Sequence, residues 1–280
     1  MLKRTVIVSA LFVVLAVLVS QAQEAGVDRY TIPLTQPDRP VQLDVSLMGA
    51  TLIVKAGAAN SVIVESRLVP DEDSDEDDED GGKRIGLRRI PNVSTGLTIE
   101  EQDNVVTIGS HRPGGSDMHV IVQVPALTSA KVHLINGGDI TMEGITGELE
   151  VQCTNGGIDL KNVGGSVVAN AINGHVRVTF TSVAAGKPMS FSSLNGDIDV
   201  TLPSETKGSL SMKADMGGEI YTDFDLALTP QTAKPEVAQR DKKGRYRVTI
   251  DRSMHGTVNG GGPEFTFKTF QGDIYLRKKK

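Results

Sequence analysis

The sequence predicts an all-β protein in which short strands alternate with tight, glycine-containing turns. Between the turns, apolar and polar residues alternate with period two, as in IDVTL at 198–202, which is typical of strands with one buried face. A turn phrase, Asn-Gly followed by Asp or Ile, recurs along the chain. No long segment has the periodicity of an amphipathic helix. We therefore expect repeated strands that stack on one another.

The first 22 residues are predicted to be a secretory signal peptide and not part of the fold. Two basic residues precede the apolar run TVIVSALFVVLAVLV at 5–19, which is short for a membrane span. Small residues follow at Ser20 and Ala22, as at a cleavage site. The alternative is an uncleaved N-terminal anchor. The expected product is an exported protein, periplasmic, cell-surface or secreted, with residues 23–280 forming a single domain that lacks a transmembrane segment.

The recurring turn divides the middle of the chain into repeats. Aligned on its glycine, it reads INGGDITM, TNGGIDLK, INGHVRVT, LNGDIDVT, DMGGEIYT and FQGDIYLR. The repeats are clearest in residues 136–225, at spacings of about 18–22 residues. Gly supplies the backbone freedom that a tight corner needs, and Asn tolerates the same conformation. The predicted structural turn residues are Asn136, Gly137, Asn155, Gly156, Asn173, Gly174, Asn195, Gly196, Gly217 and Gly272.

Two arrangements of these strands fit the spacing. In a parallel solenoid, equivalent strands of successive coils stack and cover one another's apolar faces. The asparagines of stacked corners would then form a ladder of hydrogen bonds from coil to coil. Asn-Gly is also a strong signal for an antiparallel hairpin, so a meander or propeller of hairpins would have a similar period. The constant residue order of the turn phrase favours the parallel solenoid.

Two segments interrupt the repeats. Residues 67–92 contain PDEDSDEDDEDGG and then KRIGLRR, and we expect a disordered acidic and basic loop because so polar a run cannot bury a face. Residues 226–245 are expected to be a loop excursion before C-terminal coils at 246–280. The acidic run lacks the spacing of an EF-hand loop, so it would bind divalent cations only loosely. Its carboxylates are Asp71, Glu72, Asp73, Asp75, Glu76, Asp77 and Asp78.

The repeat region resembles a known family. The run NGGDITMEGITGELEVQCTNGGIDLKNVGGSVVANAINGHVRV, with the later NGDI repeat and the VTLP step at 200–203, is similar to the exported bacterial DUF4097 proteins, candidate adhesins with β-strand repeats. The resemblance covers roughly residue 41 to the end. It implies a right-handed parallel β-solenoid in the cell envelope and supplies no catalytic residues. The acidic insertion departs from the family pattern.

The sequence predicts no catalytic residues, no cofactor and no tight metal site. A Ca²⁺ site or a polysaccharide-cleaving site would need a distinctive carboxylate pair, whereas the same residue recurs at every corner. The histidines fall in separate segments, and His175 beside Arg177 is expected at the surface. Cys153 occupies an inward position and is expected to be a buried apolar residue. The recurring carboxylates, expected to end turns and face solvent, are Asp139, Asp197, Asp199, Glu219 and Asp273.

The sequence therefore predicts a non-enzymatic envelope protein with a ridged surface for adhesion or scaffolding. The net charge of −6 gives no support to nucleic-acid binding. The expected partner is an envelope protein or a surface polysaccharide. Alternatives are a carbohydrate-active β-helix enzyme and a filament that self-associates through its terminal coils. The outward residues expected to make the contact include Asp197, Asp199, Lys213 and Tyr221.

Overall fold

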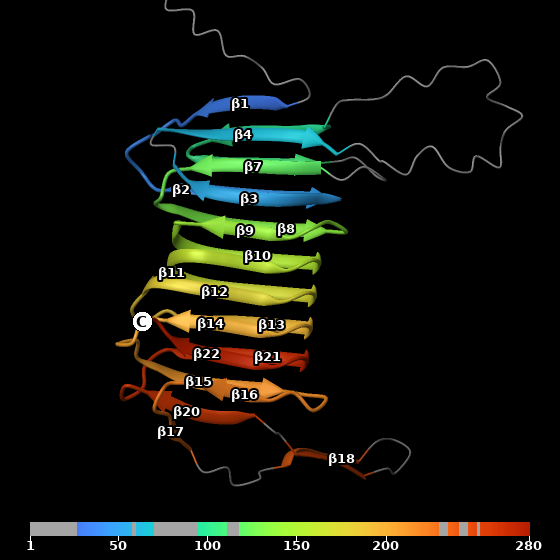
Figure 1. Cartoon of the computed structure of the whole chain (residues 1–280), viewed down its shortest axis with the longest axis vertical. Coiled ribbons are helices and arrows are strands. Elements are labelled where there is room, and N and C mark those ends of the chain that lie inside the picture. Colours follow the sequence, from blue (N-terminus) through green and yellow to red (C-terminus); the bar gives the residue numbers. More distant parts are fainter. Residues whose placement is uncertain are drawn as a thin grey trace, which may run out of the picture.

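All regular elements of the described residues are β-strands, which confirms the all-β class. The computed structural model describes residues 27–57, 60–69, 95–110, 118–229, 235–240, 246–250 and 253–280. The predicted signal peptide and acidic run lie outside these residues. Within them, no helix has the length and apolarity to cross a membrane. One 20-stranded sheet winds into a flattened tube, and a separate antiparallel pair, β18 (Pro235–Arg240) and β19 (Tyr246–Ile250), projects near one end (Figure 1).

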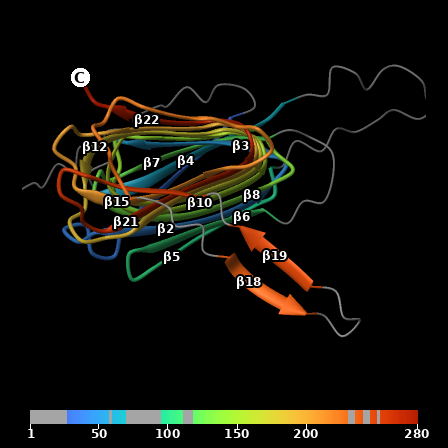
Figure 2. The same ribbon diagram turned by 90° about the horizontal axis from the view of Figure 1, so that it is seen from below.

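The tube has two walls, which Figure 2 shows end-on as the two long sides of a flattened ring. The first wall runs in the order β5 (Leu97–Gln102), β6 (Val105–Ser110), β2 (Val41–Met48), β8 (Thr128–Ile135), β10 (Thr146–Asn155), the second half of β11 (Ile158–Asn173), β13 (Met189–Asn195), β21 (Glu264–Gln271), β15 (Gly208–Ala214), β20 (Met254–Val258) and β17 (Ala227–Leu228). The second wall runs in the order β1 (Asp28–Pro33), β4 (Ser61–Leu68), β7 (Met118–Val124), β3 (Ala50–Ala56), β9 (Ile140–Glu143), the first half of β11, β12 (Val176–Val183), β14 (Ile198–Leu202), β22 (Ile274–Lys278) and β16 (Ile220–Thr222).

Pairing is parallel from β6 to β15 in the first wall and from β7 to β16 in the second. A rung is one strand of each wall joined by a corner, and equivalent residues of neighbouring rungs face each other, as Leu134, Cys153 and Ala171 do. The hairpin interpretation of the Asn-Gly corners is therefore wrong for these rungs.

The ends of the tube correct the expectation of a purely parallel stack. At one end, β5 pairs antiparallel with β6, and β4 pairs antiparallel with both β7 and β1. At the other, β20 pairs antiparallel with β15 and β17. β17 and β18 fall in residues 226–245, where the sequence predicts a loop excursion. The added strands occupy hydrogen-bonding edges that parallel rungs would leave open, which limits edge-to-edge association.

Rungs do not stack in chain order at either end. The rung β2–β3 lies between β8–β9 and the later β6–β7, and the last rung, β21–β22, lies between β13–β14 and β15–β16. Figure 1 accordingly places the C-terminus beside the middle rungs and away from the end of the tube. Because each inserted rung is covered on both sides, its apolar residues are buried more fully than they would be at an end.

The core fills the space between the walls with the inward residues of every rung. In β2 and β7, alternate residues are buried, as the period-two pattern predicts. Phenylalanines concentrate where the last rung inserts. The ring of Phe191 stacks on that of Phe267 at 5.1 Å and meets Phe180 edge-on at 6.3 Å. All three are fully buried, so the inserted rung shares one aromatic core with its neighbours.

Candidate functional site: the stacked corner edge

The corner edge is the line along which β8, β10, β11, β13 and β21 of the first wall turn into the second wall. A Cβ atom built on Gly156, Gly174 or Gly196 would lie 2.1–2.3 Å from a carbonyl oxygen of the preceding corner. Glycine is therefore required there by contact between rungs. Gly217 has positive φ but no such contact, and its neighbour Gly218 makes the contact instead, 2.1 Å from the oxygen of Gly272.

The corner asparagines form the predicted ladder. The side-chain amide of Asn155 donates to the Oδ1 atom of Asn136 at 3.0 Å, Asn173 donates to Asn155 at 2.8 Å, and Asn195 donates to Asn173 at 2.8 Å. Gln271 occupies the next position, opposite Asn195. Each amide has a second N–H and a second acceptor lone pair beyond those used in the ladder. We call this column the amide ladder.

Carboxylates beside the corner hold the backbone of the neighbouring rung. Asp139 accepts from the N–H of Gly157 at 2.6 Å, Asp197 from that of Asp273 at 2.8 Å, and Asp273 from that of Glu219 at 2.8 Å. These carboxylates therefore cap the backbone of the neighbouring rung. Each charged oxygen accepts a hydrogen bond from an N–H group that has no partner among the strand-to-strand backbone bonds. We call this column the carboxylate row.

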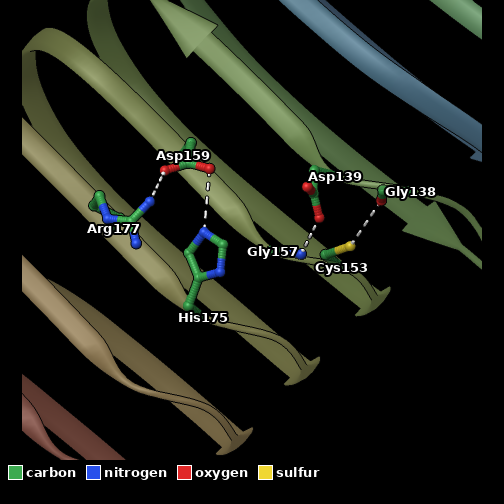
Figure 3. A network of polar contacts seen from close by, with 7 residues as sticks. All are labelled: Gly138, Asp139, Cys153, Gly157, Asp159, His175 and Arg177. Carbon is green, nitrogen blue, oxygen red and sulfur yellow. Dashed lines mark hydrogen bonds and ion pairs between the residues drawn. The ribbon is translucent and has the colours of Figure 1, made fainter.

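His175 occupies the position of the carboxylate row in its rung. Its Nε2 atom lies 3.1 Å from Oδ2 of Asp159, whose Oδ1 accepts from Arg177 at 2.9 Å (Figure 3). The missing side chain of Gly157 makes room for the ring, which lies 2.3 Å from where a Cβ would be. Asp159 was not among the predicted residues, since it meets His175 and Arg177 only through the register of β11 with β12.

Of the predicted outward residues, Asp199 and Tyr221 share one column of the second wall, whereas Lys213 lies apart on the first wall. Asp199 accepts from Arg277 at 2.8 Å on the second wall. In the same column, Tyr275 and Tyr221 stack with ring centroids 5.2 Å apart. The Tyr221 hydroxyl donates to the carboxylate of Glu219, which raises the pKa of Tyr221 to about 12. Lys213 lies on β15 of the first wall, and Asp197 in the carboxylate row.

Inward residues at the strand ends donate to corner carbonyl groups. The hydroxyls of Ser193 and Thr269 donate to the oxygens of Gly174 and Gly196, both at 2.9 Å. Cys153 takes the equivalent position, with its sulfur 3.8 Å from the oxygen of Gly138. It is buried, and desolvation raises the pKa of its thiol to about 11, with Asp139 adding to the effect. The thiol therefore acts as a weak corner donor.

We expect the Cys153 thiol to react with Ellman's reagent only after unfolding. At pH 8, a thiol with a pKa near 11 is about 0.1 % ionised, and only the thiolate attacks. Because the folded state keeps the proton to higher pH, stability should fall as the pH rises above the unfolded value of 9.0. The absorbance of the released thionitrobenzoate should be negligible in native buffer and should correspond to one equivalent per chain in denaturant. Rapid release from the native protein would contradict this placement.

No group of three or more His, Cys, Asp or Glu that could hold a metal occurs among the residues described. A groove of about 360 Å³ lies over β3, β4 and β7, with Ile53, Glu65 and His119 in its lining. Glu65 forms an ion pair with Arg29 at 3.1 Å, so the groove has one carboxylate, already neutralised, beside one histidine. That set lacks the second carboxyl group that most glycoside hydrolases use.

An apolar row runs beside the amide ladder, on the outside of the first wall. Its members precede the corner residues and face one another from rung to rung. Four are between 41 % and 46 % exposed, and two are half-buried. The row consists of five apolar residues and one threonine: Met48, Ile135, Thr154, Ile172, Leu194 and Phe270. Asp215 follows Phe270 in the next rung. The first letters of the phrases ING, TNG, ING, LNG and FQG are five of its six members, all except Met48, but the row was not predicted.

The chain matches the model of a known protein family. A family model described as Toastrack DUF4097 matches residues 98–259, more than half of the chain. The chain belongs to the Toastrack DUF4097 family. This confirms the resemblance that the NGDI-type repeats carry.

Two solved structures are similar in outline to this Toastrack chain. A candidate cell adhesion protein from Clostridium sporogenes is 11 % identical, with a TM-score of 0.44 over 90 % of this chain and 100 % of that one. A candidate adhesin from Bacteroides fragilis is also 11 % identical, with a TM-score of 0.44 over 91 % of this chain and 98 % of the other. No curated protein matches the chain.

Proposed function

We propose that this chain is an exported, non-enzymatic binding protein of the cell envelope that acts by contact along the outside of its rungs. The observation that carries the proposal is the role of the polar groups at the corner edge. The amide ladder and the carboxylate row hold rungs together, and both recur without a distinctive pair of groups. What changes from rung to rung is the outward surface, and an extended surface is how repeat proteins bind partners.

The finer architecture belongs to the same proposal. The rungs would wind as a right-handed β-solenoid of about 18–22 residues per coil, because connections between parallel strands are right-handed in about 98 % of cases. Export would follow from the apolar N-terminal run, and the mature chain would reside in the periplasm, at the cell surface or outside the cell. An envelope protein or a surface polysaccharide remains the expected partner.

The test compares binding with turnover. The exported chain, purified in full, would be titrated against envelope fractions of the producing cells and against acidic and neutral polysaccharides, with and without Ca²⁺. We expect saturable binding to envelope material and no release of reducing or unsaturated sugar ends. Turnover that disappears when Asp159 or Glu65 is changed to Asn or Gln would overturn the non-enzymatic assignment. Failure to bind any envelope fraction would overturn the binding role.

A further inference from the structure

We propose that the apolar row is the binding site for a linear, uncharged glycan, which lies along the tube across successive rungs. This inference rests on the proposed function and names the chemistry of its ligand. Ile172, Leu194 and Phe270 face one another on β11, β13 and β21 and are 41 %, 46 % and 45 % exposed. Scattered single apolar side chains are normal on protein surfaces, whereas these three adjoin one another in one column.

The dimensions of the row favour a thin polymer over a globular partner. Six rungs about 4.8 Å apart give a length of about 24 Å, and the next outward side chain lies about 7 Å away along each strand. The apolar strip therefore has a projected area of roughly 170 Å². A stable complex between two folded proteins buries about 800 Å² on each partner. The strip is long enough for several units of a chain molecule but too narrow to anchor a second copy by itself.

Peptide addition does not suit this surface. A peptide that binds a sheet does so mainly through backbone hydrogen bonds to an open edge. The row lies on the outer face of β8, β10, β11 and β13, and each of these strands is paired on both sides in the first wall. Polar contacts here must come from side chains.

The side chains beside the middle rungs of the row are uncharged hydrogen-bonding groups. On one side lies the amide ladder. On the other, one outward position earlier in the strands of the middle rungs, are Gln152, Asn170 and Ser192, of which Asn170 donates to Ser192 at 2.8 Å. His133 on β8 and Lys268 on β21 continue this column. A sugar ring has an apolar C–H face and a rim of hydroxyls that both donate and accept. An apolar strip between two amide and hydroxyl columns matches that distribution, and rungs repeat at nearly the spacing of units in an extended glycan.

Charge then selects among glycans. The carboxylate row lies just beyond the amide ladder, with Asp139 and Asp197 exposed. These two carboxylates disfavour a polyanion by like-charge repulsion, which the single Lys268 beside the last rung offsets only in part. Uronic-acid and phosphate-bearing polymers are therefore poor ligands for the site.

The test uses cellohexaose and chitohexaose as neutral probes and hexagalacturonate as the acidic probe, titrated into the full chain by calorimetry. We expect at least one neutral hexamer to bind, its disaccharide to bind at least tenfold more weakly, and hexagalacturonate to bind at least tenfold more weakly. The double variant Ile172→Ser with Leu194→Ser should lose at least tenfold in affinity. Val168→Ser removes an apolar side chain of similar exposure from the same strand outside the row, and should change affinity less than twofold.

Circular dichroism would check that the variants fold, and Leu194→Thr alone serves if the double variant does not. The glycan site is overturned if neither neutral hexamer binds, if the acidic hexamer binds equally well, or if the row variants bind like the parent. It is also overturned if sedimentation shows a dimer that the row variants lose, since a second copy would then cover the row. Envelope binding that survives in the row variants would retain the proposed function and remove this inference.

Discussion

A chain that ends at residue 262 should lose more than its last rung. Deletion of 263–280 removes β21–β22, which separate β13–β14 from β15–β16. The lost rung contains four fully buried apolar residues, and burial of each stabilises by about 1.5–3 kcal/mol. The total of about 6–12 kcal/mol is comparable to the whole stability of a typical domain. The buried residues are Phe265, Phe267, Ile274 and Leu276.

Limited proteolysis followed by mass spectrometry gives the readout. In the truncated chain, β15 and β16 should become cleavable along with everything that follows them, because β21 and β22, with which they pair in parallel, are gone. The rungs from β8 to β12 should stay protected longer. A chain shortened by Lys280 alone, an exposed terminal residue, provides the control and should unfold like the parent. Stacking in chain order would give a different result, with β15 and β16 still protected after the deletion.

The sequence predicts the rungs well because period-two alternation and the Asn-Gly phrase are local signals. Corner, strand and inward face follow from them, as does the position of Cys153 among the inward residues. Strand direction does not follow. SVIVESRL in β4 alternates as regularly as the parallel strands, yet β4 is antiparallel to β7. Alternation specifies which face is buried and contains no information on which neighbour lies beside a strand or in which direction that neighbour runs.

The order of the rungs could not be predicted from the sequence, for a related reason. FTFKTFQGDIYL at 265–276 has the same pattern as any middle rung, so it fits between any two others. Its contacts with both neighbouring rungs distinguish its place, among them those of Phe267 with Phe191 on one side and with Met212 on the other. The candidate site was missed for a different reason. The prediction followed charged outward residues, while the apolar row needed each residue before the corner to be compared across repeats.

Gly174→Ala should destabilise the protein by about 3 kcal/mol or more, near the upper end for overpacking. The new methyl group would lie 2.1 Å from the carbonyl oxygen of Gly156 and 2.4 Å from its carbon. Both are backbone atoms, so no side chain can move aside, and the rungs must separate. Separation would weaken the backbone bond from Gly156 to the oxygen of Asn173, now 2.9 Å, and the ladder bond from Asn173 to Asn155 beside it. Urea unfolding followed by circular dichroism measures the loss.

Gly109→Ala is the matched control, because it makes the same chemical change and restricts the unfolded chain equally. A Cβ atom at Gly109 would have no heavy atom within 4 Å, and its φ lies outside the left-handed region. Alanine there should leave stability unchanged or raise it by about 0.4–1 kcal/mol, through the lower entropy of the unfolded state. The two variants should thus differ by about 3–4 kcal/mol, all of it arising in the folded state. A difference below about 1 kcal/mol would mean that neighbouring corners do not touch, and the close stacking that aligns the amide ladder and the apolar row would have to be abandoned.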